Sequence, residues 1–150
     1  MFWSRDKKAR VALEWEQRIR QSFPFLFTEL QASILSNRYY PRHFSVKVIV
    51  IRAGNFNLKF SRDCTMNDDE LLVDIAQVNE AREWRPLIYA ILALTTNEEA
   101  PTIPPFKVFG TFTGLSILLQ PIVHQLDEAF SRSNYPRTEE RMDTIRRVRR

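Results

Sequence analysis

Residue types that build common functional sites are scarce in this chain of 150 residues, which has one cysteine, two histidines and three glycines. A single cysteine excludes an intrachain disulfide and is typical of a protein kept in a reducing compartment. The sequence also lacks GxxxxGK[ST], GxGxxG and GxSxG, which mark many nucleotide-binding sites and serine hydrolases. We therefore expect no cofactor and no catalytic activity of these kinds.

The chain also lacks a long hydrophobic segment. Its longest apolar run, Leu87–Leu94, has eight residues, whereas a membrane-spanning helix needs about 20. The charges in Met1–Lys8 have no apolar segment behind them, so we expect no signal peptide. A domain of this length can fold without a metal or disulfides. These features predict a cytoplasmic protein that does not enter a membrane.

The positive charge is confined to the C-terminal end. Residues 132–150 carry seven arginines and three acidic residues, which accounts for the whole net charge of +4. We therefore predict one domain over residues 1–132 and a basic tail over residues 133–150. Two roles stay open for the tail: a mobile, solubilising C-terminus, or contact with nucleic-acid phosphates.

Residues 44–62 carry the clearest structural signal, a β-hairpin. Phe44–Arg52 is rich in β-branched residues, and Phe56–Arg62 alternates apolar and polar side chains. Gly54 and Asn55 between them suit a two-residue turn that needs glycine first. With Ala53 opposite Phe56, the register places Ile49, Ile51, Phe56, Leu58 and Phe60 together on one apolar face. The same register extends to Ser45 opposite Cys64.

The first strand of this hairpin is apolar on its second face too, at Phe44, Val46, Val48 and Val50, whereas the second strand is polar there. Either another segment covers this face, or it presents an apolar stripe to a partner. We favour internal cover because large apolar patches are seldom left exposed.

Residues 70–78 are ambiguous. As a strand, Leu71, Val73 and Ile75 share a face; as a helix, Asn67 and Glu70 form a capping box. We favour a third strand. The predicted fold is therefore α+β, with a central antiparallel meander packed by N-terminal and C-terminal helices.

Helices are predicted on both sides of the meander. Arg5–Gln21 repeats apolar residues every four positions, and a second helix capped by Ser22 would place Phe27 and Ile34 on one face, before a turn at 37–41. Helices are also expected over 86–96, opened by a proline, and over 113–131, kinked or restarted by another. A short strand is expected at 106–109. Within the tail we expect a short helix that is capped by Thr138 and has Met142, Ile145 and Val148 on its apolar side.

Four segments carry a family resemblance: Asn57–Asp63 (NLKFSRD), Leu71–Ile75 (LLVDI), Glu83-Trp84 and Leu126–Ser131 (LDEAFS). Together they resemble small bacterial immunity-type proteins, often encoded beside polymorphic toxins. The resemblance implies a β-meander flanked by helices, and a cytosolic protein that binds and blocks one toxin. Many such proteins have Asp-Arg-Gly before the third strand, where this chain has a longer acidic loop. They share no catalytic set, so no functional residues are carried over.

Two further patterns of residues could form a site. The hairpin register brings Cys64 diagonal to His43, and a cysteine beside a histidine can form a reactive thiolate. Both residues lie at strand ends, where pairing is least certain. His124 and Glu128 share a helix face at i and i+4, but no metal-binding spacing such as CxxC or HExxH occurs. Incidental surface residues are the simpler reading of both patterns, so we predict no metal site.

The acidic residues around the third strand are the predicted binding site. Asp68, Asp69 and Glu70 form either a solvated turn or a contact patch for a basic partner, joined by Asp74. A toxin that attacks nucleic acid has a basic active site, and an acidic loop would speed its association. We therefore predict a non-catalytic protein-binding module, plausibly an immunity protein. The alternatives are a nucleic-acid-associated protein that uses its arginine tail, and a small Cys/His enzyme.

Overall fold

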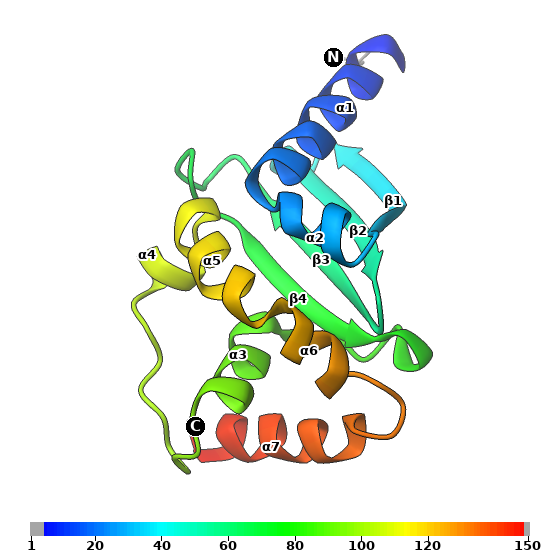
Figure 1. Cartoon of the computed structure of the whole chain (residues 1–150). Coiled ribbons are helices and arrows are strands. Elements are labelled where there is room, and N and C mark those ends of the chain that lie inside the picture. Colours follow the sequence, from blue (N-terminus) through cyan, green and yellow to red (C-terminus); the bar gives the residue numbers. More distant parts are fainter. Residues whose placement is uncertain (1–4, 149–150) are drawn as a thin grey trace.

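The computed structural model describes residues 5–148. It confirms the α+β class, with an antiparallel sheet in the order β1-β2-β3-β4-β5 and helices packed on it (Figure 1). The strands are β1 (Ser33–Tyr40), β2 (Val46–Ala53), β3 (Phe56–Arg62), β4 (Leu72–Gln77) and β5 (Arg85–Pro86). The helices are α1 (Arg5–Ser22), α2 (Pro24–Glu29), α3 (Leu87–Thr95), α4 (Phe106–Phe109), α5 (Phe112–Leu119), α6 (Val123–Ala129) and α7 (Tyr135–Val148), with 3₁₀ turns η1 (Val78–Glu80) and η2 (Gln120–Ile122).

The central hairpin forms in the predicted register. Ala53 pairs with Phe56, Ile51 with Leu58 and Ile49 with Phe60, and all six side chains are fully buried. β4 follows as the third strand of the meander, so the strand reading of residues 70–78 is confirmed for Leu72–Gln77. The pairing ends at Lys47 and Arg62. The extension of the register to Ser45 and Cys64 was therefore wrong.

The turn of the hairpin is fixed from outside by α6. The predicted turn requires a positive φ at its first central residue only. Gly54 has φ +58° and Asn55 does not have a positive φ, as this turn requires. The Asp127 carboxylate accepts the Asn55 main-chain N–H at 2.7 Å, and the Asp127 carbonyl accepts the Asn55 side-chain amide at 3.0 Å. A Cβ on Gly54 would lie 2.1 Å from Asp127 Oδ1. Only glycine therefore satisfies both the backbone and the contact with α6.

Residues 22–41 depart from the prediction. α2 ends at Glu29, and β1 occupies Ser33–Tyr40, where a helix face and a turn were expected. The N-cap of α2 is Phe23, without a side-chain hydrogen bond, so Ser22 is not the cap. β1 has a polar sequence because it is an edge strand with a bulge between Ile34 and Ser36. Pairing with β2 decides its conformation, and the local apolar pattern does not reveal that pairing.

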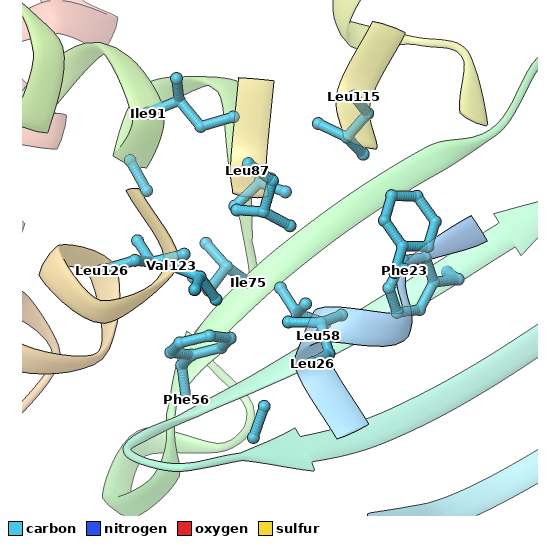
Figure 2. Close-up of a cluster of buried hydrophobic side chains, with 14 of the residues drawn as sticks. Phe23, Leu26, Phe56, Leu58, Ile75, Leu87, Ile91, Leu115, Val123 and Leu126 are labelled. Atoms are coloured by element: carbon cyan, nitrogen blue, oxygen red, sulfur yellow. The ribbon is translucent and has the colours of Figure 1, made fainter. Parts of the chain in front are cut away.

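Most of the sheet's core residues point to one side, where the helices pack, and buried Ala76 is an exception on the other side. Figure 2 shows Leu26 of α2, Leu87 of α3, Leu115 of α5 and Leu126 of α6 on the same side of the sheet as Leu58. Aromatic rings from α1, α5, β3 and the N-cap of α2 meet at one end. The ring centroids of Trp15 and Phe112 lie 5.7 Å apart, edge to face, and those of Phe23 and Phe60 lie 5.2 Å apart. No helix within residues 5–148 has the length and apolar character to cross a membrane.

The chain between α3 and α7 follows the prediction in part. Pro121 interrupts the helix expected over 113–131, and the chain forms α5, the turn η2 and α6, as a proline restart requires. The prediction of a strand at residues 106–109 was wrong, because this segment is α4. Its carbonyls bond locally, as in Gly110 N–H to the Phe106 carbonyl at 2.6 Å.

The expected basic tail contains α7, which packs against α3. Tyr135, Met142 and Ile145 are buried in the core. Thr138 does not cap the helix; its hydroxyl donates to the Ala129 carbonyl at 2.8 Å from within the helix. The arginines occupy the exposed side of an amphipathic helix, and a charge count cannot distinguish that arrangement from a mobile tail. Residues 149 and 150 lie outside the described residues.

The face of the sheet away from the helices is open over much of its area, although Asn57 and Ala76 on this face are buried. We call this the outer face, and its larger apolar residues are Tyr40, Val46, Val48, Val50 and Leu72. The three valines are partly exposed, Leu72 is 48% exposed and Tyr40 is 41% exposed. The helices that contact the sheet lie on its other face, so the expected internal cover is not found within the described residues.

Arg85 fastens α7 to the edge of the sheet and provides a test of this packing. Its guanidinium donates to Tyr135 Oη at 3.1 Å and pairs with Glu139 at 3.0 Å and Asp143 at 3.3 Å. We expect Arg85→Met to lower the free energy of unfolding by about 1–2 kcal/mol, because three partners lose a charged donor. Urea unfolding measures this, with the exposed Arg82→Met as control. Equal stability of the two variants would contradict the role of Arg85.

Tyr135 predicts a specific loss of stability in alkali. Burial raises its pKa to about 12 from the ordinary value of 10.0, although Arg85 opposes the rise. As the pH rises, the unfolded chain therefore loses the Tyr135 proton before the folded chain does. The contribution of Tyr135 to the free energy of unfolding is complete below pH 10.0 and declines as the pH rises toward about 12. The stability difference between wild type and Tyr135→Phe should shrink over this range in urea titrations. A constant difference would contradict the assignment.

Candidate functional site

Three chain segments meet where β2 begins and β3 ends. We call them the loop end of the sheet: the β1–β2 turn (41–45), the β3–β4 loop (63–71) and the α4–α5 junction (110–112). The Cys64 N–H donates to the Phe44 carbonyl at 2.9 Å, which joins the turn to the loop. The Leu71 N–H donates to the Gly110 carbonyl at 2.9 Å, and the Phe112 N–H donates to the Asp69 main-chain carbonyl at 2.8 Å. These two hydrogen bonds join the loop to the junction.

Two arginines hold the β3–β4 loop by its backbone. The Arg62 guanidinium, at the end of β3, donates to the carbonyls of Asn67 and Glu70 at 2.5 and 2.7 Å and to that of Met66 at 3.4 Å. The Arg18 guanidinium of α1 donates to the Asp68 carbonyl and stacks on the Phe112 ring, 4.0 Å from its centroid. The loop is therefore ordered by donors to its main chain.

The carboxylates of the predicted site have different environments within this loop. Asp68 and Asp69 are exposed, and neither has an ion pair within the described residues. Asp69 Oδ1 lies 3.4 Å from the Thr113 hydroxyl. The Glu70 carboxylate instead accepts the Asn67 side-chain amide at 2.9 Å, inside the loop. The structure thus leaves Asp68 and Asp69 as the available acidic groups.

Asp74 lies apart from the loop on the outer face of β4. Its carboxylate is 3.8 Å from the Lys59 ammonium, which also lies 4.7 Å from the centre of the Trp84 ring. Burial raises the pKa of Asp74, and Lys59 lowers it in part. Asp74 therefore already has an ion-pair partner in this chain, whereas Asp68 and Asp69 form no ion pair among residues 5–148.

Cations gather behind the acidic loop. Lys47 and Arg62 are direct cross-strand partners, and Arg18 of α1 is close enough to interact with both. Burial lowers the pKa of Lys47 first, and the positive charges of Arg62 and Arg18 lower it further. Burial likewise lowers the pKa of Arg18, while Asp69 and Asp68 raise it. The exposed carboxylates therefore lie near a group of three cations, of which Arg18 interacts with both of them.

The predicted Cys–His arrangement is not formed as expected. Because the strand pairing stops at Lys47, Cys64 is bonded through its backbone to Phe44. His43 lies in the turn, where its N–H donates to the Tyr40 carbonyl at 3.3 Å. No hydrogen bond between the Cys64 and His43 side chains is found in the described part of the chain, and the Cys64 side chain is exposed.

His124 and Glu128 also do not act as a pair. His124 Nε2 lies 3.3 Å from the carboxylate of Glu29 in α2. Within residues 5–148 no three histidine, cysteine or acidic side chains are grouped as metal ligands would be.

An open groove of about 520 Å³ lies between α3, α6 and α7, and the residues that line it are Ala93, Leu94, Asn97, Gln125, Glu128, Ala129, Asn134, Arg137, Thr138 and Arg141.

Phe44 is the feature of the loop end that sequence reasoning missed, because it was counted as the first residue of a strand. It instead lies in the β1–β2 turn, and its side chain is 72% exposed, the highest value among the large hydrophobic residues described. Phe44 and Ser45 have φ values of 56° and 51°. Pro41, which favours a turn, was the available signal that the strand starts later.

Comparison of the chain with protein-family models, curated proteins and solved structures gives no match. The function must therefore be argued from the loop end itself.

The holding of the loop by Arg62 can be tested directly. We expect Arg62→Met to leave three carbonyls without their donor and to lower the free energy of unfolding by about 1–3 kcal/mol. The amides of residues 65–70 should exchange hydrogen faster in mass spectrometry while those of β2 stay protected. Arg52→Met, an exposed substitution in the same hairpin, is the control. Unchanged exchange in the Arg62 variant would show that the loop is ordered by other contacts.

Proposed function

We propose that the chain is a non-catalytic protein-binding module that uses its loop end to bind a partner with a basic surface. The observation that carries the proposal is the arrangement of charge in the β3–β4 loop. Arg18 and Arg62 donate to main-chain carbonyls of the loop and form no ion pair with its carboxylates. Asp68 and Asp69 are therefore exposed and form no direct ion pair within the described residues.

An ordered loop favours binding. Association loses part of its free energy when a flexible segment must be fixed. Here the loop is already joined to α1, β3 and the α4–α5 junction by hydrogen bonds. Its exposed carboxylates can therefore meet cations of a partner without a large loss of conformational entropy. Charges of this kind chiefly accelerate association and set its specificity.

The resemblance to immunity-type proteins supports a finer proposal about the partner. A toxin that cleaves or modifies nucleic acid needs a basic surface for phosphates. An acidic, preorganised loop is complementary to that surface and could block it without any reaction. The proposed partner is thus a cognate toxin encoded beside this chain, and the proposed mechanism is occlusion.

We expect Asp68→Lys/Asp69→Lys to slow association with the inactivated product of the adjacent gene by about tenfold or more, because attraction is replaced by repulsion. Stopped-flow kinetics at low and high salt measure this, and the effect should shrink as salt screens the charges. In cells, the variant should protect less well against the active toxin.

The matched control is Glu98→Lys/Glu99→Lys, which changes the net charge equally in an exposed loop elsewhere. It should associate like wild type. An equal effect of the two double variants would point to net charge alone and remove the loop from the interface. Failure of the wild-type protein to bind the adjacent product or to protect against it would refute the immunity proposal.

A further inference from the structure

We propose that Phe44 is the apolar anchor of this interface and inserts into an apolar pocket beside the basic surface of the partner protein. This inference rests on the proposed function and specifies the partner's chemistry further. Three observations support it: the exposure of Phe44, its backbone conformation, and the hydrogen bond between its carbonyl and the acidic loop.

The exposure of Phe44 has no explanation within the fold. Most large apolar side chains of this chain are buried in the core, and Phe44 is 72% exposed. An exposed phenyl ring does not contribute burial energy to folding. Binding energy in protein interfaces is concentrated in a few large side chains near the centre of the contact. Phe44 has the size and accessibility of such a side chain.

The backbone at Phe44 is also unfavourable. Phe44 and Ser45 both lie in the left-handed region, which residues with a Cβ adopt at an energetic penalty. Glycine would fit both positions better. A bulky side chain kept in a strained turn and pointing into solvent is the pattern expected when function, and not stability, determines the residue.

The position of Phe44 links it to the proposed partner. Its carbonyl accepts the Cys64 N–H at 2.9 Å, so the turn is fastened to the loop that carries Asp68 and Asp69. In the other direction, Val46 and Tyr40 continue as a cross-strand pair on the open outer face. One partner seated on the loop end can therefore meet the carboxylates and the phenyl ring together.

Charge complementarity selects a basic protein over other occupants. The fully exposed charges of the turn and the loop are Asp68 and Asp69 on one side and Arg42 on the other, and Asp63 is partly exposed. A hydrogen bond from the Thr65 side chain lowers the pKa of Asp63, so this carboxylate is ionised at neutral pH. An anionic lipid surface or an acidic protein would be repelled by this acidic rim. A pocket rimmed with lysine or arginine would be attracted.

The experiment compares Phe44→Gly with Ser45→Gly, using the inactivated product of the adjacent gene as the ligand. Both substitutions should raise the urea midpoint or leave it unchanged, because both relieve a left-handed residue. Only Phe44→Gly should weaken binding, by roughly 30-fold or more in calorimetry. Ile117→Ala, at a residue 69% exposed on α5, controls for loss of any exposed apolar side chain and should bind like wild type.

Each outcome decides the inference. Equal loss of binding in Phe44→Gly and Ser45→Gly would assign the effect to turn conformation and overturn the anchor. Wild-type binding by Phe44→Gly, together with slow association of the Asp68/Asp69 variant, would overturn the anchor and leave the proposed function intact. Self-association of the free protein that Phe44→Gly abolishes would assign the ring to a second copy and overturn it too. Absence of any wild-type binding would refute both proposals.

Discussion

The pairing of β2 with β3 is the constraint on which the rest of the molecule depends. It places Ile49, Ile51, Leu58 and Phe60 on one face, and every described helix that contacts the sheet packs there. A shift by one residue would turn these side chains to solvent. Asp127 of α6 binds the turn of the hairpin, so the C-terminal helices fix the same register from outside. The sheet therefore gains its single buried face from local sequence and from distant contacts together.

The same pairing creates the loop end. Because the ladder stops at Lys47 and Arg62, two cations lie opposite each other at the last paired position. Like charges directly opposite are unfavourable, and the charge of Arg62 lowers the pKa of Lys47. The Arg62 guanidinium donates to loop carbonyls. The end of the hairpin thus orders the β3–β4 loop, and the loop then presents its carboxylates near the three cations. The hydrogen bonds that order the β3–β4 loop and the exposed charge of that loop both depend on where the β2–β3 pairing ends.

The hairpin, the third strand and the proline restart at Pro121 could be predicted because each depends on neighbours in the chain. β1 could not, since its polar sequence becomes a strand only through pairing with β2. A helix in the tail with Met142 and Ile145 on its apolar side was expected, but its packing against α3 depends on a distant element and was not. At the site, the acidic residues were visible in the sequence. The contacts of Arg18 with the loop and of Lys59 with Asp74 come from other elements and were not, whereas the donor to Glu70 is Asn67 in the same loop.

Local rules fail at the loop end in a way that itself carries information. Sequences usually agree with their structure at each level, and exceptions concentrate at functional sites. Here a phenylalanine occupies a left-handed turn position and is exposed, while the turn is held by a hydrogen bond to Cys64. Burial and backbone preference would both select a small or polar residue at this position. Neither preference explains Phe44, and this is the physical reason for proposing a contact between Phe44 and a partner outside this chain.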